Sequence, residues 1–417
     1  MLAGLIRQTL DANRDLRAAL ARYQRAEALL RGSRAEQLPD VGVSASAAEQ
    51  HLADVERTPP GAGDDRVELY QAAAGLSWEL DLFGRLRRAS EAQRAELGAA
   101  GADLAALQVA LVGQLATSYF ELRGLQQQLL VARSNVDNQR QSLEIVRSRV
   151  GAGRGTAFDE VRAISQLEAT RAVVPDLQAA VRARMFRIAV LTGQNPAALV
   201  DELAPPAPLP ESLPVIPVGS PGEVLRRRPD IRAAERRLAA ASARIGVATA
   251  DLFPSFSLDA LIGSVASDSG DLFSAGAETR RVALGVDWTF LDFGRVRSRI
   301  DAADADSQAA LANYEQTVLL ALEETETQLV RYARSRERSE RLGAATDAAG
   351  EAAELARTRY RQGFIGFFEV LAAEQELIDT RDALIESRTA ETLAMVNIYR
   401  ALAGAPGAAT PIASAND

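Results

Sequence analysis

The chain of 417 residues has no cysteine, a single histidine and few aromatic residues. The absence of cysteine excludes disulfides, thiol chemistry and Cys-type zinc sites, and it leaves the redox compartment undetermined. Because His51 is the only histidine and lies in a polar stretch, the common transition-metal sites are excluded too. The formal net charge of −9 argues against nucleic acid as a partner, since binding to phosphates needs a basic surface.

The sequence also lacks a long uninterrupted apolar run. No segment reaches about 18 consecutive apolar residues, so we expect no transmembrane helix. The best candidate, residues 104–120, is interrupted by polar residues: Gln108, Gln114, Thr117 and Ser118. The N-terminal residues lead directly into an amphipathic helix without a visible signal peptide. This pattern predicts either a cytoplasmic protein or one whose leader has been trimmed.

A long internal repeat is the strongest positive signal. The only two tryptophans, Trp78 and Trp288, lie 210 residues apart, as do the Phe-Gly-Arg triplets 83–85 and 293–295 and the glycines Gly153 and Gly363. Each triplet opens a helical run of roughly 65 residues, which would be on the order of 100 Å long. We therefore expect one protomer, residues 1–417, built from two tandem halves. The expected boundaries are a first repeat at 1–192, a linker at 193–221, a second repeat at 222–404 and a tail at 405–417.

Each half predicts the same series of elements: a helix, two strands and a long helical hairpin. In the first half these are a helix over 2–37, strands at 41–47 and 76–82, a helix over 83–150 and a returning helix over 158–191. In the second half they are a helix over 221–250, strands at 256–265 and 282–290, a long helix from 294 and a last helix ending near 404. Leucines spaced by threes and fours, from Leu104 to Leu129, predict a heptad-like seam on the first long helix.

The strands alternate apolar and polar residues, which predicts a sheet with one apolar face. Four strands cannot close a barrel alone, since the smallest closed membrane barrels have about eight. An open sheet with an apolar outer face would aggregate. Several copies that pool their strands would solve this problem, so the sequence predicts an obligate oligomer that is mainly α with a β-barrel part.

Several sequence blocks, in register along essentially the whole chain, resemble those of one known family. They are Leu225 to Ile231, Ala234-Glu235, Ile245-Gly246, Leu252 to Pro254, Ser77 to Arg85, Tyr360 to Gly363, Glu369 to Leu371 and Tyr399 to Leu402. The family is that of the outer-membrane factors, the TolC-like channels. The resemblance is greatest to the outer-membrane component of tripartite resistance-nodulation-division (RND) drug efflux pumps.

This resemblance implies a homotrimer in the outer membrane of a Gram-negative bacterium. Three protomers would pool twelve strands into a barrel and twelve helical strands into a periplasmic tunnel, with an equatorial belt formed by the linker and the C-terminal residues. The implied partners are a periplasmic membrane-fusion adaptor, an inner-membrane RND transporter and outer-membrane lipid, with no cofactor. Members of the efflux branch usually carry a signal peptide and a lipid-anchored cysteine before the first helix. This sequence shows neither, which a trimmed leader or a non-lipidated natural form would explain.

The resemblance also implies a set of site residues. The adaptor would dock at the turns of the two hairpins, which contain Gly151, Gly153, Gly155, Gly363 and Gly366. The gate would include Asp159, Tyr360 and Glu369, where Tyr360 matches a tyrosine that bonds to the Asp159 position in some members. Two departures, Ile365 for a basic residue and Ala372 for a second acid, predict a closed state resting on apolar packing of Ile365, Phe367 and Phe368. The junctions between strands and helices would contain Trp78, Gly84, Trp288 and Gly294.

The function that follows is a passive exit duct for small toxic compounds, gated by iris-like opening of the helical tips. A second hypothesis keeps the fold and makes the chain the exit channel of a type I protein secretion system. A third, of a different class, is a soluble coiled-coil scaffold or the adaptor itself. An enzyme is disfavoured, because the sequence shows no constellation of nucleophile and base and no metal site.

Overall fold

A computed structural model describes residues 1–57, 65–210 and 227–402. The chain divides into two compact units. Among the described residues, the helical unit comprises 1–20, 103–210, 227–231 and 317–402, and the sheet unit comprises 21–57, 65–102 and 232–316. The predicted tail at 405–417, the end of the predicted linker and the start of the Leu225 to Ile231 block lie outside the described residues.

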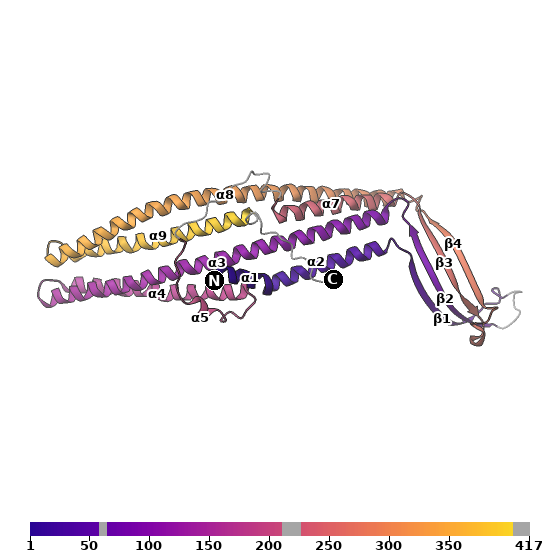
Figure 1. Ribbon diagram of the computed structural model, residues 1–417, viewed down its shortest axis with the longest axis horizontal. Coiled ribbons are helices and arrows are strands. Elements are labelled where there is room, and N and C mark those ends of the chain that lie inside the picture. The colour runs from indigo at the N-terminus through magenta and orange to yellow at the C-terminus, as the bar shows by residue number, and fades with distance from the viewer. Residues whose placement is uncertain (58–64, 211–226, 403–417) are drawn as a thin grey trace. The chain divides into compact units, whose positions relative to one another are not determined.

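The sheet unit contains an antiparallel sheet whose strand order follows the chain (Figure 1). Its strands are β1 (Asp40–His51), β2 (Arg66–Leu80), β3 (Ser255–Ala266) and β4 (Glu278–Asp287). Two hairpins, β1–β2 and β3–β4, are joined by pairing of β2 with β3. Among the described residues, the outer edges of β1 and β4 have no partner strand. The sheet is therefore open on both sides, as the strand count predicts.

The register gives the sheet two chemically different faces. One row across the strands runs Val41, Leu76, Ala260 and Val282, which are all apolar. The neighbouring row contains the Ser77–Asp259 pair on the other face, where the Ser77 hydroxyl donates a hydrogen bond of 2.8 Å to Asp259. This confirms the predicted alternation: one face suits lipid and the other suits water.

The predicted strand bounds are wrong at several places, since β1 continues to His51 rather than ending at 47 and β4 begins at Glu278 rather than at 282. Strand β2 begins at Arg66 rather than at 76, because the small residues Ala72 to Ala74 continue the ladder without adding a strong apolar pattern. Strand β4 ends at Asp287, so Trp288 and Phe290 lie beyond it. The Trp288 indole instead donates to the carbonyl oxygen of Leu252 at 3.1 Å, where the chain turns away from the ladder.

Eight α-helices are described. They are α1 (Leu2–Ala12), α2 (Arg14–Ala35), α3 (Arg85–Gly151), α4 (Ala157–Leu191), α5 (Val200–Leu203), α7 (Pro229–Ala250), α8 (Phe293–Gln362) and α9 (Phe367–Ala401). A short 3₁₀ turn, Ser269–Asp271, precedes β4. The single helix predicted over 2–37 is wrong, because the chain breaks at Asn13. The Asn13 side chain accepts from the backbone N–H groups of Asp15 and Leu16, capping α2, and donates to the Leu191 carbonyl at 2.9 Å.

The core of the helical unit lies along the predicted leucine seam of α3. Leu111, Leu115 and Leu122 are buried against Met185 and Ile188 of α4, which confirms the seam. The same helix bears on the expectation of no transmembrane helix, which rests on the absence of an unbroken apolar run of about 18 residues. One window of 18 residues in α3 has a mean hydropathy of 1.4, although the core helix of a soluble protein passes the same test. A mean hydropathy over a window can stay high when a few polar residues interrupt it, whereas a count of consecutive apolar residues cannot.

Candidate functional site at the helical tips and the strand-to-helix junctions

Both hairpin turns of the helical unit end in the same backbone motif. After α3, the N–H of Gly153 donates to the Val150 carbonyl and the N–H of Arg154 donates to the Arg149 carbonyl, at 2.9 and 2.8 Å. After α8, Gly363 and the next residue repeat this pattern. These are Schellman caps, which need a left-handed residue, and the φ angles of Gly153 and Gly363 are +73° and +85°. Glycine is therefore required at both tips by backbone geometry.

Asp159, a predicted gate residue, belongs to a local cap. Its backbone N–H donates to the Thr156 hydroxyl oxygen, and its carboxylate accepts from the Thr156 backbone N–H, both at 3.2 Å. This capping box starts α4, so the carboxylate has a structural role at the first turn. No hydrogen bond from the Tyr360 hydroxyl to Asp159 is among the contacts of the described residues, although the Asp159 carboxylate is near enough to raise the pKa of that hydroxyl.

Tyr360 instead lies in an apolar cluster between the two hairpins. Tyr360 is buried, and the centre of its ring lies 5.7 Å from the centre of the Phe367 ring. Leu143 and Val370 belong to the same cluster, and Ile365 packs against it. Burial is the main cause that raises the pKa of the Tyr360 hydroxyl. The Arg149 guanidinium opposes this shift, and the Asp159 carboxylate adds a smaller increase.

Arg149, at the end of α3, reaches Tyr360 from the other hairpin. Its guanidinium lies 4.3 Å from the centre of the Tyr360 ring and donates a hydrogen bond to the Tyr360 carbonyl oxygen. A cation–π contact and a hydrogen bond to one residue therefore connect α3 to α8.

Phe368 lies outside this cluster, with 60% of its surface exposed, and Phe158 and Phe364 are exposed as well. The Arg162 guanidinium makes cation–π contacts with the rings of Phe158 and Phe368, at 5.5 and 5.0 Å from their centres. Glu369 is exposed in the first turn of α9 and takes no part in this contact. The predicted gate residues thus separate into a buried group, with Tyr360 and Phe367, and an exposed group, with Phe368 and Glu369.

A buried polar network, which the sequence analysis missed, connects α3 to α8 and α9. Glu374 of α9 is 2% exposed. Its carboxylate accepts hydrogen bonds from Gln139 at 3.1 Å, from Ser142 at 2.9 Å and from the Arg357 guanidinium at 2.7 Å. The spacing of residues on α9 could have revealed this network. Glu374 lies four residues after Val370 and three before Leu377, so it shares the helix face of these two buried residues and places a carboxylate on an apolar face.

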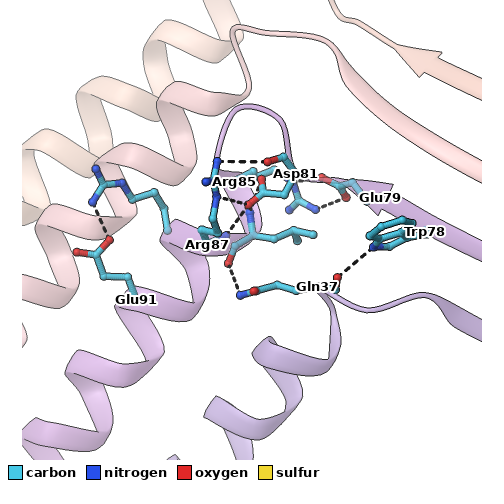
Figure 2. A network of polar contacts seen from close by, with 9 residues as sticks. Gln37, Trp78, Glu79, Asp81, Arg85, Arg87 and Glu91 are labelled. Carbon is cyan, nitrogen blue, oxygen red and sulfur yellow. Dashed lines mark hydrogen bonds and ion pairs between the residues drawn. The ribbon is translucent and has the colours of Figure 1, made fainter.

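The junction between β2 and α3 is held by a second polar network (Figure 2). The Trp78 indole donates to the Gln37 carbonyl at 3.0 Å, and the Arg85 guanidinium binds both carboxylate oxygens of Glu79, at 2.9 and 2.5 Å. Asp81 accepts from the backbone N–H of Arg87 at 2.9 Å and so caps the start of α3. The chain can reverse there because Gly84 has a φ angle of +85°.

The second junction repeats one part of this arrangement. Trp78 donates to the residue before Leu38-Pro39, and Trp288 donates to the residue before Phe253-Pro254. The two tryptophans therefore perform the same structural task, which is to hold the end of a strand against the end of the preceding helix. Gly294 has open space around its Cα, so it has no close neighbour that requires glycine.

The Arg228-Pro229-Asp230 part of the predicted motif joins the start of α7 to α8 and to the end of α9. The buried Arg228 guanidinium forms a bidentate ion pair with Asp230 at 3.1 and 2.7 Å, and it also binds Glu324 of α8 at 2.9 Å. It donates to the Ala401 carbonyl at 3.0 Å, which caps the end of α9. Pro229 stands at the first position of α7, where its missing N–H leaves no unsatisfied donor.

No group of three or more acidic or histidine side chains among the described residues could hold a metal ion. The sheet unit thus contains an open sheet with one apolar face. In the helical unit, the tips of the long hairpins are held by an apolar cluster, a cation–π contact and hydrogen bonds.

The model of the outer membrane efflux protein family matches residues 5–194 and 220–404, one match for each half of the chain. The chain belongs to this family. It is therefore an outer-membrane protein that forms the exit duct of an efflux system.

Individual relatives agree with this assignment. The outer-membrane channel OprN superposes with a TM-score of 0.92 at 42% identity, over 97% of this chain and 90% of that one. The solvent efflux pump outer membrane protein SrpC of Pseudomonas putida is 31% identical over 97% of this chain and 85% of its own length. Nodulation protein T of Rhizobium leguminosarum bv. trifolii is 30% identical over 95% of this chain and 85% of its own. This family assignment confirms the resemblance found in the sequence.

Proposed function

We propose that this protein works as a homotrimer that pools twelve strands into one barrel and forms a passive exit duct for small toxic compounds. The observation that carries the proposal is the open sheet, whose two outer strands lack partners and whose apolar face is uncovered among the described residues. In lipid, every backbone N–H and C=O must be paired, so an open four-stranded sheet cannot span a membrane alone. Closure with further copies supplies the missing partners.

Small-molecule export is favoured over protein export by the names of the relatives. SrpC is named for solvent efflux, and other relatives of similar identity are named for the efflux of toluene and of antibiotics. The proposal therefore includes a membrane-fusion adaptor and an inner-membrane RND transporter as partners, because a duct without a catalytic step of its own needs an external source of energy. The polar face of the sheet, with Ser77 and Asp259, suits a water-filled lumen.

Gating is proposed to act at the tips of the two hairpins. The contact of Arg149 with Tyr360 and the cluster around Tyr360 and Phe367 hold α3 against α8 and α9. Docking of the adaptor at the glycine turns, beside the exposed Phe158 and Phe368, would separate these contacts and widen the duct.

Two replacements of Tyr360 test this gate. Because the ring carries the packing and the hydroxyl has no bond to Asp159 in the described structure, Tyr360→Ala is expected to raise single-channel conductance several-fold, whereas Tyr360→Phe keeps it near the wild-type value. Conductance in planar bilayers is the measurement, with drug resistance of the host as a second readout. Unchanged conductance and resistance after alanine replacement at Asp159, Tyr360 and Glu369 would contradict the gate.

A further inference from the structure

The two halves of the sheet have the same internal register. Counting from Trp78 and Trp288, residues of β2 and β4 correspond at a separation of 210, and counting from Leu38-Pro39 and Phe253-Pro254, residues of β1 and β3 correspond at a separation of 215. Under this correspondence the pair Val41–Leu76 of the first hairpin becomes Phe256–Val286, which is a pair of the second hairpin. The two hairpins are therefore structural equivalents, residue by residue.

The pairing between the hairpins defines how one hairpin meets the next. Leu76 of β2 stands opposite Ala260 of β3. The equivalent of Leu76 is Val286 on the outer edge of β4, and the equivalent of Ala260 is Ala45 on the outer edge of β1. Within one chain, β1 and β4 are at opposite ends of the sheet and cannot meet.

From this equivalence we infer the register in which two copies of the chain join: Val286 of β4 stands opposite Ala45 of β1 in a second copy. The same register places Leu284 opposite Ala47 on the apolar face, and Ala283 opposite Ala48 on the polar face. This inference deepens the proposed trimer and rests on it, because it assumes that the free edges close against identical copies.

The stagger between strands supports this register over its neighbours. The stagger is the shift along the strand between a residue's equivalent in the next hairpin and the residue that the pairing leads to. Val41 pairs with Leu76, which pairs with Ala260, whereas the equivalent of Val41 is Phe256, so the stagger within the chain is four residues. Between copies, Phe256 pairs with Val286, which in the inferred register stands opposite Ala45 of the next copy. The equivalent of Phe256 in that copy is Val41, so this stagger is also four residues. The stagger is then equal at every joint, which gives all strands of a closed barrel one tilt.

Other registers fail on one of two grounds. A slip by one residue would turn the apolar face of one copy toward the polar face of the next. A slip by two residues keeps the apolar faces of the two copies on the same side. It makes the stagger between copies, where β4 meets β1, different from the stagger within a chain, where β2 meets β3. One such slip, with Val286 opposite Val43, places Arg280 directly opposite Glu49 and so offers an ion pair. In the inferred register these two charges are diagonal neighbours, still within reach of long side chains. The two-residue slip is therefore the strongest rival.

Disulfide formation distinguishes these registers. Because the 417 residues contain no cysteine, the two introduced thiols are the only ones in each chain. Directly opposed strand residues have Cα atoms about 4.5–5.5 Å apart, which suits a disulfide, whereas diagonal neighbours lie about 7–8 Å apart. Val286→Cys is combined in turn with Val43→Cys, Ala45→Cys and Ala47→Cys, all on one face of the sheet. Oxidised samples are then separated on denaturing gels without reductant.

The pair with Ala45→Cys is expected to give covalent dimers and trimers at ten times the yield of the other two pairs or more. Ala283→Cys with Ala48→Cys should confirm it from the other face, and each single-cysteine variant should stay monomeric on the gel. A maximum at Val43→Cys or Ala47→Cys would overturn the register while leaving the trimer in place. A protein that light scattering shows to be trimeric, yet that forms no disulfide in any pair, would overturn edge pairing. A monomer in detergent would instead contradict the proposed function.

Discussion

Replacing Glu374 by alanine is expected to lower the free energy of unfolding of the helical unit by about 3 kcal/mol, since it removes the shared acceptor of three donors. Breaking a buried ion pair typically costs about 3–5 kcal/mol, and the lower end applies because Arg357 is one-third exposed. Gln139 and Ser142, which are both buried, would lose their partner at the same time. The measurement is urea denaturation in detergent, with hydrogen exchange across α3 and α9 to locate the loss.

Two further variants separate the network from a general loss of charge. Glu386→Ala removes an exposed acid of the same helix, whose hydrogen bond with Gln128 is long at 3.5 Å, and it should change stability by about 0.5 kcal/mol or less. Replacing both Glu374 and Arg357 by leucine should cost less than the two single changes together, because neither charge is then left unpaired. Equal losses from Glu374→Ala and Glu386→Ala would show that the network contributes nothing specific.

Arg228→Met is expected to destabilise the helical unit by about 2–4 kcal/mol, because it removes the ion pairs with Asp230 and Glu324 and the cap on Ala401. Arg228→Lys should fall between this variant and the wild type, since lysine keeps the charge but not the planar fork that binds Asp230 with two hydrogen bonds. The shift of the urea midpoint measures both effects.

Arg227→Met is the matched control, because it makes the same chemical change at an exposed neighbouring position. It should leave the midpoint nearly unchanged. If Arg227→Met and Arg228→Met shifted the midpoint equally, the account of the motif as a joint between helices would be wrong.

The repeat predicts most of the fold because its signals are local. Trp78 and Trp288 mark the strand ends, the leucines of α3 mark its buried side, and Gly153 and Gly363 mark the turns, and each signal depends only on backbone geometry or periodicity. The break at Asn13 was missed because a cap inside a continuous amphipathic pattern looks like one more polar residue.

The tips were harder to predict, because their contacts join helices that are far apart in the sequence. Asp159 was assigned to a gate by resemblance, yet its strongest contacts are with Thr156, three residues away. The bond of Arg149 to Tyr360 spans 211 residues and that of Gln139 to Glu374 spans 235, which no periodicity reveals. A carboxylate on an apolar helix face was the one local sign of the second contact.

The most direct test of the whole account is the mass of the purified protein in detergent and in plain buffer, measured by light scattering. The account predicts three copies of the 44.5 kDa chain that need detergent to remain in solution, because the apolar face of the sheet must be covered by lipid or its substitute. A monomer or dimer that is soluble without detergent would contradict the pooled barrel.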